Sequence, residues 1–389
     1  MSHYNTVFHE LLKLVPRHEF ESVVFRHQGD YRVRKMNCWN HFATLLYAQI
    51  SGKDSLRDIE VGINAQPEKL YHLGMKEIRR STLSDANNNR PCEIYEEIFE
   101  KTLGRVYQIT TKHKFKFSNP LFTLDATTID LCLEVFPWAK FRKTKGAVKL
   151  HTLFDHSGYF PSVVVMTDGK THDSKLAQEL SADTFQADSI FLVDKAYICF
   201  KWLSGLTSRG CYFVTRAKDN MKYASIGQHN QPQSEKGLLA DKIIRLTGFY
   251  TSQKYPDQLR LVIYKDRETG KVYEFLTNNF TLSPFTIAKL YKERWQVELF
   301  YKWIKQNLKI KSFFGTSKNA VLSQIWSAMV YYLLLCYIKF QSRYKNSLLY
   351  LSRIIRETLM ERVGLIDLLK LKVENLARIK NTIQLCLQF

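Results

Sequence analysis

The stretch LYKERWQVELFYKWIKQNLKI, Leu290 to Ile310, is the segment around which the rest of the chain is organised. At about 100° per residue its side chains separate into two faces, so its periodicity predicts one amphipathic helix. The apolar face would pack on a core and consists of Val297, Leu299, Phe300, Trp303, Ile304 and Leu308. The opposite face is a stripe formed by Tyr291, Arg294, Glu298, Lys302, Lys305 and Lys309.

A solvated surface is the plain interpretation of such a stripe, but its single acid leaves most of the cations without a local partner. The large aromatic residues Trp295 and Tyr301 flank the stripe. Cations beside aromatic rings suit an anionic polymer, and a lone carboxylate among them suits a metal ion. The stripe therefore favours nucleic acid chemistry.

Composition favours the same class of partner. The chain has 389 residues, of which 57 are Lys or Arg and 37 are Asp or Glu, so its net charge is +20. This balance attracts phosphate backbones through counterion release, and a membrane surface is the weaker alternative. With 45% hydrophobic residues, the chain is expected to be globular rather than disordered.

Neither secretion nor a disulfide framework is predicted. The seven cysteines have no CxxC spacing and the N-terminus lacks a signal-peptide pattern, so we expect a cytoplasmic protein with reduced thiols. Residues 319–338 approach the length of a membrane span. Polar residues in the first turns of this stretch favour a buried core helix instead, and no membrane association is expected.

The chain divides into five segments by pattern. Residues 1–115 have helical spacing and predict an all-α N-terminal domain. Residues 116–218 read as three consecutive strands, a helix, a strand, a helix and a strand, which is the ribonuclease-H-like order. Residues 219–285 predict a β-rich insertion, 286–340 complete the catalytic core, and 341–389 form a helical tail. The predicted fold class is therefore mixed α+β, with a ribonuclease-H-like core in which helices flank a mixed sheet.

Three polar segments lie outside these regular elements. Residues 76–91 carry Arg79 and Arg80 and predict a helix-turn-helix-like DNA-binding unit, with a polar interhelical loop as the alternative. Residues 219–237 are expected to form a long polar loop. The run KFRKTKGAVK, residues 140–149, is a further candidate for DNA backbone binding through Arg142, Lys143 and Lys145.

Two carboxylates occupy positions where strands rarely carry them. Asp125 lies inside the predicted strand TLDATTI, and Asp194 ends the apolar run SIFLVD. Singly, Asp125 could be a satisfied core carboxylate and Asp194 a helix N-cap. With Glu298 they supply two strand acids and one helix acid, the set that holds two divalent metals in this fold. Other acids are assigned to the opposite strand face, to turns or to a helix cap, namely Asp130, Asp155, Asp168 and Asp173.

The spacing of Tyr291, Arg294, Glu298 and Lys305 resembles the Y-R-E-K signature of bacterial insertion-sequence DDE transposases of the cut-and-paste class. Trp295, directly after the arginine, also fits that class. The resemblance is strongest over residues 120 to 340, and transposases of this class carry a β insertion at the same point of the core.

The strand acids extend this resemblance. Asp125 stands in a D-x-T context and Asp194 in a D-x-x-Y context, as in that class. Lys195 and Ala196 depart from the arginine and glycine often found between the acid and the tyrosine.

The resemblance implies an activity, a cofactor and a partner. Asp125, Asp194 and Glu298 would be catalytic and would hold two Mg²⁺ ions, with Mn²⁺ as a substitute. The enzyme would cut double-stranded DNA at the inverted-repeat ends of its own element, form hairpins there and join them to target DNA. A homodimer is implied in the synaptic complex. The alternatives are a catalytically inactive, transposase-derived DNA-binding regulator, a structure-directed nuclease and, last, a membrane-surface protein.

The resemblance also assigns DNA contacts on the stripe. Tyr291, Arg294 and Lys305 would hold phosphates at the element end, with Trp295 and Lys302 beside them. The aromatic residue that stacks on a displaced base stays open among Tyr250, Tyr255, Tyr264 and Trp295.

Overall fold

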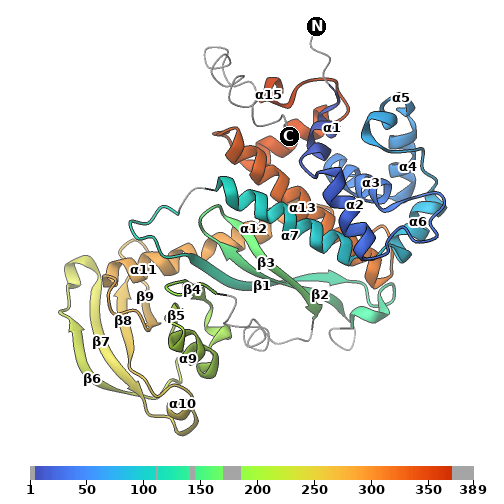
Figure 1. The fold of residues 1–389 in the computed structure, drawn as a ribbon. Coiled ribbons are helices and arrows are strands. Elements are labelled where there is room, and N and C mark those ends of the chain that lie inside the picture. The colour runs from blue at the N-terminus through green and yellow to red at the C-terminus, as the bar shows by residue number, and fades with distance from the viewer. Residues whose placement is uncertain (1–4, 111–112, 141–144, 170–184, 370–389) are drawn as a thin grey trace. The chain divides into compact units, whose positions relative to one another are not determined.

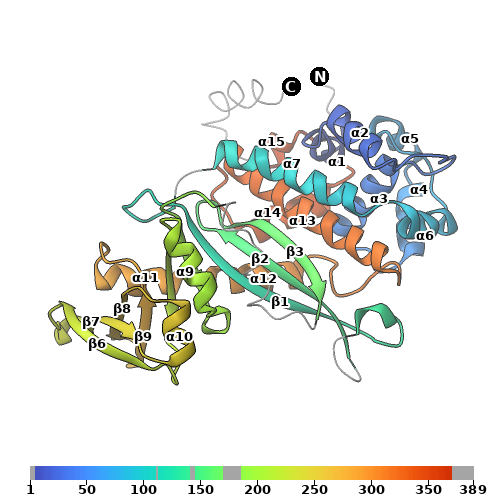
Figure 2. The same cartoon turned by 60° about the horizontal axis from the view of Figure 1, so that its bottom comes forward.

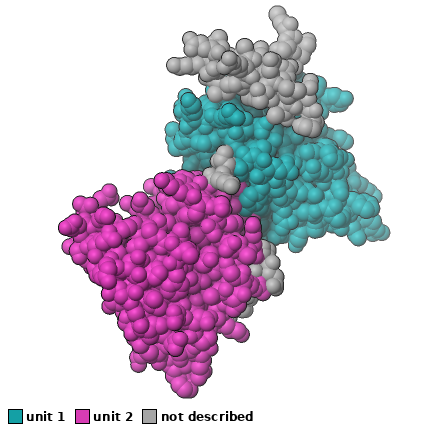
Figure 3. Space-filling view, turned by 60° about the vertical axis from the view of Figure 1, so that its left-hand side comes forward, with its two compact units in different colours: residues 1–110, 130–139, 303–389 teal, residues 111–129, 140–302 magenta. Residues whose placement is uncertain are grey.

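The computed structural model describes residues 5–110, 113–140, 145–169 and 185–369. The chain separates into two compact units, which Figure 3 colours differently. The first unit comprises residues 1–110, 130–139 and 303–389, and the second comprises residues 111–129 and 140–302. Both units therefore combine stretches that are distant in sequence, and they cut across the segments drawn from the sequence pattern.

The N-terminal part of the first unit is helical, as predicted. Its α-helices are α1 (Val7–Lys13), α2 (Arg17–Arg26), α3 (Cys38–Ser51), α4 (Leu56–Asn64), α5 (Pro67–Leu70), α6 (Arg80–Asn89) and α7 (Glu93–Ile109). Thr6, Asn37 and Ser55 cap three of them, because each side chain accepts a hydrogen bond from a backbone amide in the first turn. Each such cap stabilises its helix by about 1 kcal/mol.

Helix α13 (Lys318–Gln341) is the core helix of this unit. It lies along α7 and also packs on α3 and α6, as Figures 1 and 2 show. By length and composition alone it could cross a membrane, but 89% of its most apolar window is buried inside the protein. The predicted buried core helix is thus confirmed. Two further helices follow, α14 (Leu348–Thr358) and α15 (Leu365–Leu368).

The second unit is built on one sheet. Its first part contains β1 (Leu121–Leu131), β2 (Gly146–Asp155), β3 (Phe160–Asp168), β4 (Ile190–Val193) and β5 (Tyr212–Arg216) in the order β3-β2-β1-β4-β5. Strand β4 runs parallel to both β1 and β5, with α9 (Phe200–Ser208) as the crossover, whereas β2 and β3 are antiparallel. This is the ribonuclease-H-like topology that the element order predicted. The helix expected around residues 173–183 lies outside the described residues.

Strand β4 is buried on both faces, as its continuous apolar sequence predicted. Phe191 and Val193 pack into the same cluster as Leu203 of α9. Ile190 and Leu192 pack on the other face, in the cluster that contains Ile287 and Leu290 of α11 (Pro284–Glu293). The sheet therefore has a helix on each face at the position of the candidate acids.

The insertion extends this sheet instead of forming a separate one. Its elements are β6 (Tyr223–Asn230), β7 (Leu238–Leu246), α10 (Phe249–Lys254), β8 (Leu259–Lys265) and β9 (Val272–Thr277). Strand β9 pairs antiparallel with β5, so the nine strands within the described residues form one sheet. The predicted loop at residues 219–237 is wrong in part, because β6 lies within it. This edge strand is largely exposed, so it lacks the alternation of apolar residues that marks a half-buried strand.

Candidate active site

Asp125 and Asp194 lie beside each other in the sheet register. The parallel pairing of β1 with β4 places Leu124 opposite Val193, so the two acids are the next residues along their strands. Because side chains alternate along a strand, both acids share the face of Leu121 and Ile190, which is the face covered by α11. Asp125 is partly buried inside β1. Asp194 caps the short 3₁₀ helix Lys195–Tyr197 by accepting a hydrogen bond from the amide of Ala196 at 3.0 Å.

Glu298, the third acid, reaches this face from the helix that follows α11. One residue separates the two helices. The sequence predicted one helix from Leu290 to Ile310, but α11 ends at Glu293 and α12 spans Trp295–Asn307. Arg294 is the junction, with αR backbone angles, and Glu298 lies in the first turn of α12. No glycine or proline marks this break, so the sequence carried no local signal for it.

Tertiary contacts hold the chain on both sides of the junction. The carboxylate of Glu293 forms an ion pair with Lys114 at 2.7 Å and accepts a longer hydrogen bond from the Tyr159 hydroxyl at 3.4 Å. On the other side, the hydroxyl of Tyr301 donates to the backbone carbonyl of Asp125 at 2.8 Å. Tyr301 was expected beside the stripe, but it is buried and joins α12 to the strand that carries the first acid.

Arg294 bridges two of the three acids. Its Nη1 donates to Oδ2 of Asp125 at 3.2 Å, and its Nη2 donates to Oε1 of Glu298. The guanidinium also lies 5.8 Å from the centroid of the Tyr291 ring. The sequence assigned Arg294 to DNA phosphates alone, whereas this structure directs it into the acid cluster.

The acid cluster changes the ionisation of its most buried member. Burial raises the pKa of the Asp125 carboxyl to about 6, and the negative charges of Glu298 and Asp194 act in the same direction. The Ala126 amide and the Arg294 guanidinium oppose this rise, because both favour the charged carboxylate. The charges of Glu298 and Asp194 thus both act on Asp125.

The donor set suits a hard divalent ion, since Asp125, Asp194 and Glu298 all offer carboxylate oxygens. Among the residues that the structure describes, no group of three or more His, Cys, Asp or Glu is gathered at metal-binding spacing. Arg294 engages one oxygen of Asp125 and one of Glu298. A metal ion that used the same oxygens would have to displace the guanidinium.

The remaining stripe residues and the flanking Trp295 differ in exposure. Trp295 and Lys302 are exposed, while Tyr291 and Lys305 are half-buried. The Tyr291 ring packs on Phe275, with 5.1 Å between the ring centroids. Burial lowers the pKa of Lys305. Two residues of the expected apolar face differ: Leu299 is 43% exposed and Trp303 is only half-buried, whereas Val297, Phe300, Ile304 and Leu308 are buried as predicted.

The other DNA-contact candidates are placed in part. Arg79, Arg80 and Lys145 are exposed, and Arg142 and Lys143 lie outside the described residues. The expected helix-turn-helix segment contains α6, and Asn87 in that helix is buried, where its side-chain oxygen lies 2.7 Å from Nε2 of His41.

The candidate stacking aromatic residues can be narrowed from four to three. Tyr255 is fully buried and hydrogen-bonds Thr207, so it cannot stack on a base. Trp295 and Tyr250 are 56% and 71% exposed, and Tyr264 is half-buried.

Comparison with known proteins gives one large family match. Residues 116–334 match the family described as "Transposase DDE domain", and residues 3–76 match a "Domain of unknown function (DUF4372)". The chain is 29% identical over 271 residues to a probable transposase for insertion sequence element IS5377 of Geobacillus stearothermophilus, covering 69% of this chain and 70% of that protein. It is 30% identical over 283 residues to a putative transposase, y4zB, of Sinorhizobium fredii, covering 72% of this chain and 77% of that protein.

One solved structure is similar at low identity. It is the synaptic complex of piggyBac transposase with hairpin DNA, with a TM-score of 0.47 and 10% identity over 97% of this chain and 81% of that one.

Proposed function

Because the chain belongs to the Transposase DDE domain family of DNA-cleaving and strand-transferring enzymes, we propose that it moves an insertion sequence by a cut-and-paste pathway. In this proposal Asp125, Asp194 and Glu298 form the catalytic centre and hold two Mg²⁺ ions, which Mn²⁺ can replace. One observation carries the proposal. Asp125 and Asp194 lie at adjacent positions of two parallel strands, and Arg294 forms ion pairs with both Asp125 and Glu298.

The chemistry follows from these side chains. Bound Mg²⁺ would supply charge neutralisation at the scissile phosphate and activate the attacking water or 3′-hydroxyl. The three carboxylates would supply its oxygen ligands, and Asp125 would take this role once its carboxyl is ionised. Positioned cations and metal-held oxygens are sufficient for phosphoryl transfer, so this proposal needs no covalent protein–DNA intermediate.

Arg294 has two roles in this scheme. Without DNA it neutralises Asp125 and Glu298, which are both within its reach. A phosphate beside the cleavage point offers the guanidinium a bidentate partner in place of the carboxylates. Tyr291 and Lys305 would hold further phosphates, and the exposed Trp295 and Lys302 extend the same surface.

The partner is double-stranded DNA, at the inverted-repeat ends of the element and at the target. We assign the helical segment 1–115 to end binding, with Arg79 and Arg80 as contacts. Arg142, Lys143 and Lys145 would bind the backbone near the catalytic core, which comprises residues 116–218 and 286–340. Residues 219–285 are the insertion and 341–389 the helical tail. The proposal also includes hairpin formation at the element ends. The synaptic complex would contain a homodimer, in the bacterial cytoplasm.

A cleavage assay tests this proposal. Purified protein is incubated with labelled DNA that spans the ends of the element around its own gene, with Mg²⁺, with Mn²⁺ or with chelator. We expect metal-dependent breaks at the element boundary that disappear in Glu298→Gln and Asp194→Asn. Asp130→Asn is the matched control, because Asp130 is an exposed carboxylate on the same strand as Asp125.

The products decide between the pathways. Hairpinned ends would support the cut-and-paste route, and breaks away from the boundary would favour a structure-directed nuclease. End binding without breaks under any metal would favour the alternative function, an inactive DNA-binding regulator.

A further inference from the structure

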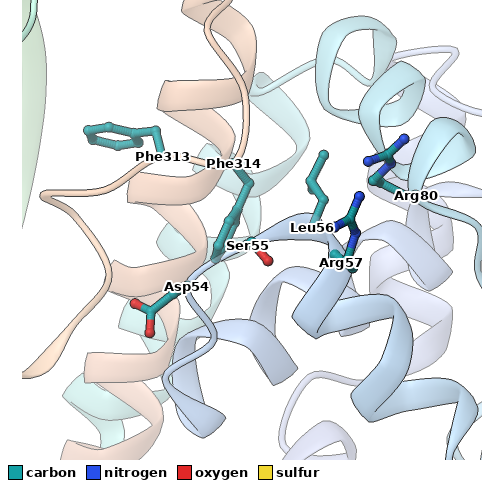
Figure 4. A pocket seen from close by; sticks show the side chains of 7 residues that line it. All are labelled: Asp54, Ser55, Leu56, Arg57, Arg80, Phe313 and Phe314. Carbon is teal, nitrogen blue, oxygen red and sulfur yellow. The ribbon is translucent and has the colours of Figure 1, made fainter.

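The first unit contains a charged pocket outside the acid cluster, and Arg80, which the proposed function assigns to end binding, is one of its lining residues. Its volume is about 380 Å³, and three segments of the chain line it: the turn before α4 with its first residues, the start of α6, and the loop between α12 and α13. Figure 4 shows the lining residues, which are Asp54, Ser55, Leu56, Arg57, Arg80, Phe313 and Phe314.

The charged residues of the pocket lining are two arginines and one aspartate. Arg57 and Arg80 are exposed, and neither guanidinium has an ion-pair partner within the part of the chain that the structure describes. Asp54 is the single acidic residue of the lining, and Lys309 already neutralises it at 2.5 Å. Figure 4 shows both guanidinium groups on one side of the pocket and the Asp54 carboxylate on the other. Two positive charges are thus left for an anionic ligand.

The loop that forms the aromatic wall is held rigidly by two buried glutamines. The side-chain oxygen of Gln49 accepts from the Lys309 amide at 2.8 Å. Gln324 donates to the carbonyls of Lys309 and Ser312 at 2.6 and 2.8 Å and accepts from the Phe314 amide at 3.0 Å. A preformed wall lowers the entropy cost of binding, because the loop is already ordered before the ligand arrives.

The aromatic side chains make the pocket more than an anion site. Phe314 is buried, whereas Phe313 is half-exposed. The Phe313 ring packs against Phe136, with 6.0 Å between the ring centroids. Arginines and phenylalanines in one lining match a phosphate group and the sugar or base next to it. The lining therefore has the chemistry of a nucleotide within a strand, with charge for the phosphate and an apolar surface for its neighbour.

We propose that this pocket binds one backbone phosphate and its adjoining nucleotide in the DNA of the element end, as a second DNA site separate from the acid cluster. The inference rests on the proposed function, since DNA is its ligand. It gives a role to Asp54, Ser55, Leu56 and Arg57, which belong to the matched segment of unknown function. It also continues the basic stripe, because Lys305 and Lys309 precede Phe313 in the same stretch of chain.

The test is DNA binding by fluorescence anisotropy without metal, in the full-length Glu298→Gln protein, across a range of salt concentrations. In this background Arg57→Ala/Arg80→Ala should weaken binding to an element-end duplex about tenfold or more. It should also reduce the slope of log affinity against log salt by about 1, since loss of the one phosphate contact removes roughly 0.9. Phe313→Leu should weaken binding while leaving the slope unchanged.

Two controls separate the pocket from general charge and from misfolding. Arg353→Ala/Arg362→Ala removes two exposed arginines of the same unit and should change the slope by less than half as much. Arg57→Lys/Arg80→Lys keeps both charges and should restore the slope, and thermal melting checks that each variant is folded. Inorganic phosphate at millimolar concentration should not weaken binding of the element-end duplex as much as Arg57→Ala/Arg80→Ala does, because a free anion lacks the contact with Phe313.

The outcomes are distinct. An unchanged affinity and slope in the folded Arg57→Ala/Arg80→Ala variant would overturn the site, and so would an equal loss in the Arg353→Ala/Arg362→Ala control. If free phosphate weakened DNA binding as much as Arg57→Ala/Arg80→Ala does, the pocket would be a simple anion site. That result would overturn the nucleotide assignment. Because no metal or cleavage is needed, failure here leaves the catalytic proposal standing, and absence of cleavage leaves a positive binding result standing.

Discussion

At the scale of single residues, Arg294 is the side chain whose role differs most from expectation. It was assigned to DNA, yet it neutralises Asp125 and Glu298 in the DNA-free protein. A cation that shares ligands with a metal ion must compete with it. Metal loading and DNA binding are therefore expected to be coupled through this one guanidinium, since a phosphate that attracts Arg294 would release the carboxylates.

The first prediction concerns this competition. In the absence of DNA, Arg294→Gln should bind Mn²⁺ about tenfold more tightly than the unmodified protein, because the carboxylates lose an internal counter-ion. Titration calorimetry with Mn²⁺ measures the change. Lys302→Gln is the matched control, since it removes a neighbouring exposed cation of α12 and should leave the affinity nearly unchanged. Equal or weaker Mn²⁺ binding in Arg294→Gln would contradict the competition.

The second prediction concerns pH and the buried His41. Burial lowers the pKa of His41 to about 4, whereas the unfolded chain has an ordinary value near 6.5. Between these values the unfolded state binds a proton that the folded state does not, so stability falls as the pH drops from 6.5 towards 4. The loss is about 3 kcal/mol at the lower limit. Its structural basis is the burial of the ring, and the hydrogen bond between His41 and Asn87 opposes this lowering of the pKa only in part.

Urea denaturation at several pH values between 7 and 4.5 measures this loss. The comparison is with His41→Gln, which is less stable at neutral pH but lacks the titrating ring. The difference in stability between the two proteins should shrink as the pH falls. A difference that stays constant over this range would show that His41 does not govern the acid sensitivity of the fold.

At the scale of elements, the insertion is tied to the start of α11 by a fully buried ion pair. Arg260 on β8 donates two hydrogen bonds of 2.8 Å to Asp241 on β7. The same guanidinium donates to the carbonyls of Asn279 and Leu282, in the loop that leads into α11. Because α11 leads directly to Arg294 and Glu298, this pair contributes to where the third acid lies.

The third prediction follows from that burial. Arg260→Met should lower the free energy of unfolding by about 3–5 kcal/mol, because it leaves the Asp241 carboxylate buried without its counter-ion. The double variant Arg260→Met/Asp241→Leu should recover most of the loss, since no unpaired charge remains. Chemical denaturation of the full chain measures both variants. Equal destabilisation in the single and double variants would mean that the carbonyl contacts, and not the charge pair, dominate.

At the scale of the whole molecule, the net charge of +20 is expected to control DNA binding beyond any single contact. The fourth prediction is that affinity for a random duplex falls steeply between about 50 and 200 mM salt, as expected for several phosphate contacts. Anisotropy titrations with random and element-end duplexes of equal length measure it. A random duplex whose affinity hardly changes with salt would contradict the electrostatic interpretation.

Much of the fold could be predicted because its signals are local. Helical spacing in residues 1–115 and the continuous apolar run before Asp194 are set by neighbouring side chains. Strand β6 was missed because an exposed edge strand has no apolar face, so only its pairing with β7 defines it. The break between α11 and α12 was missed because no glycine or proline marks it, and contacts of Glu293 and Arg294 with distant residues accompany it.

The sequence by itself determined the ribonuclease-H-like order of elements and identified the three candidate acids and the basic stripe, because periodicity, charge and motif spacing all act over short stretches of chain. Only the tertiary structure decided that Arg294 lies between Asp125 and Glu298, that Tyr301 holds the strand of Asp125, and that Arg57, Arg80 and Phe313 share one pocket. These contacts join residues up to hundreds of positions apart. No local pattern encodes them, since they exist only once the packing of strands and helices brings the side chains together.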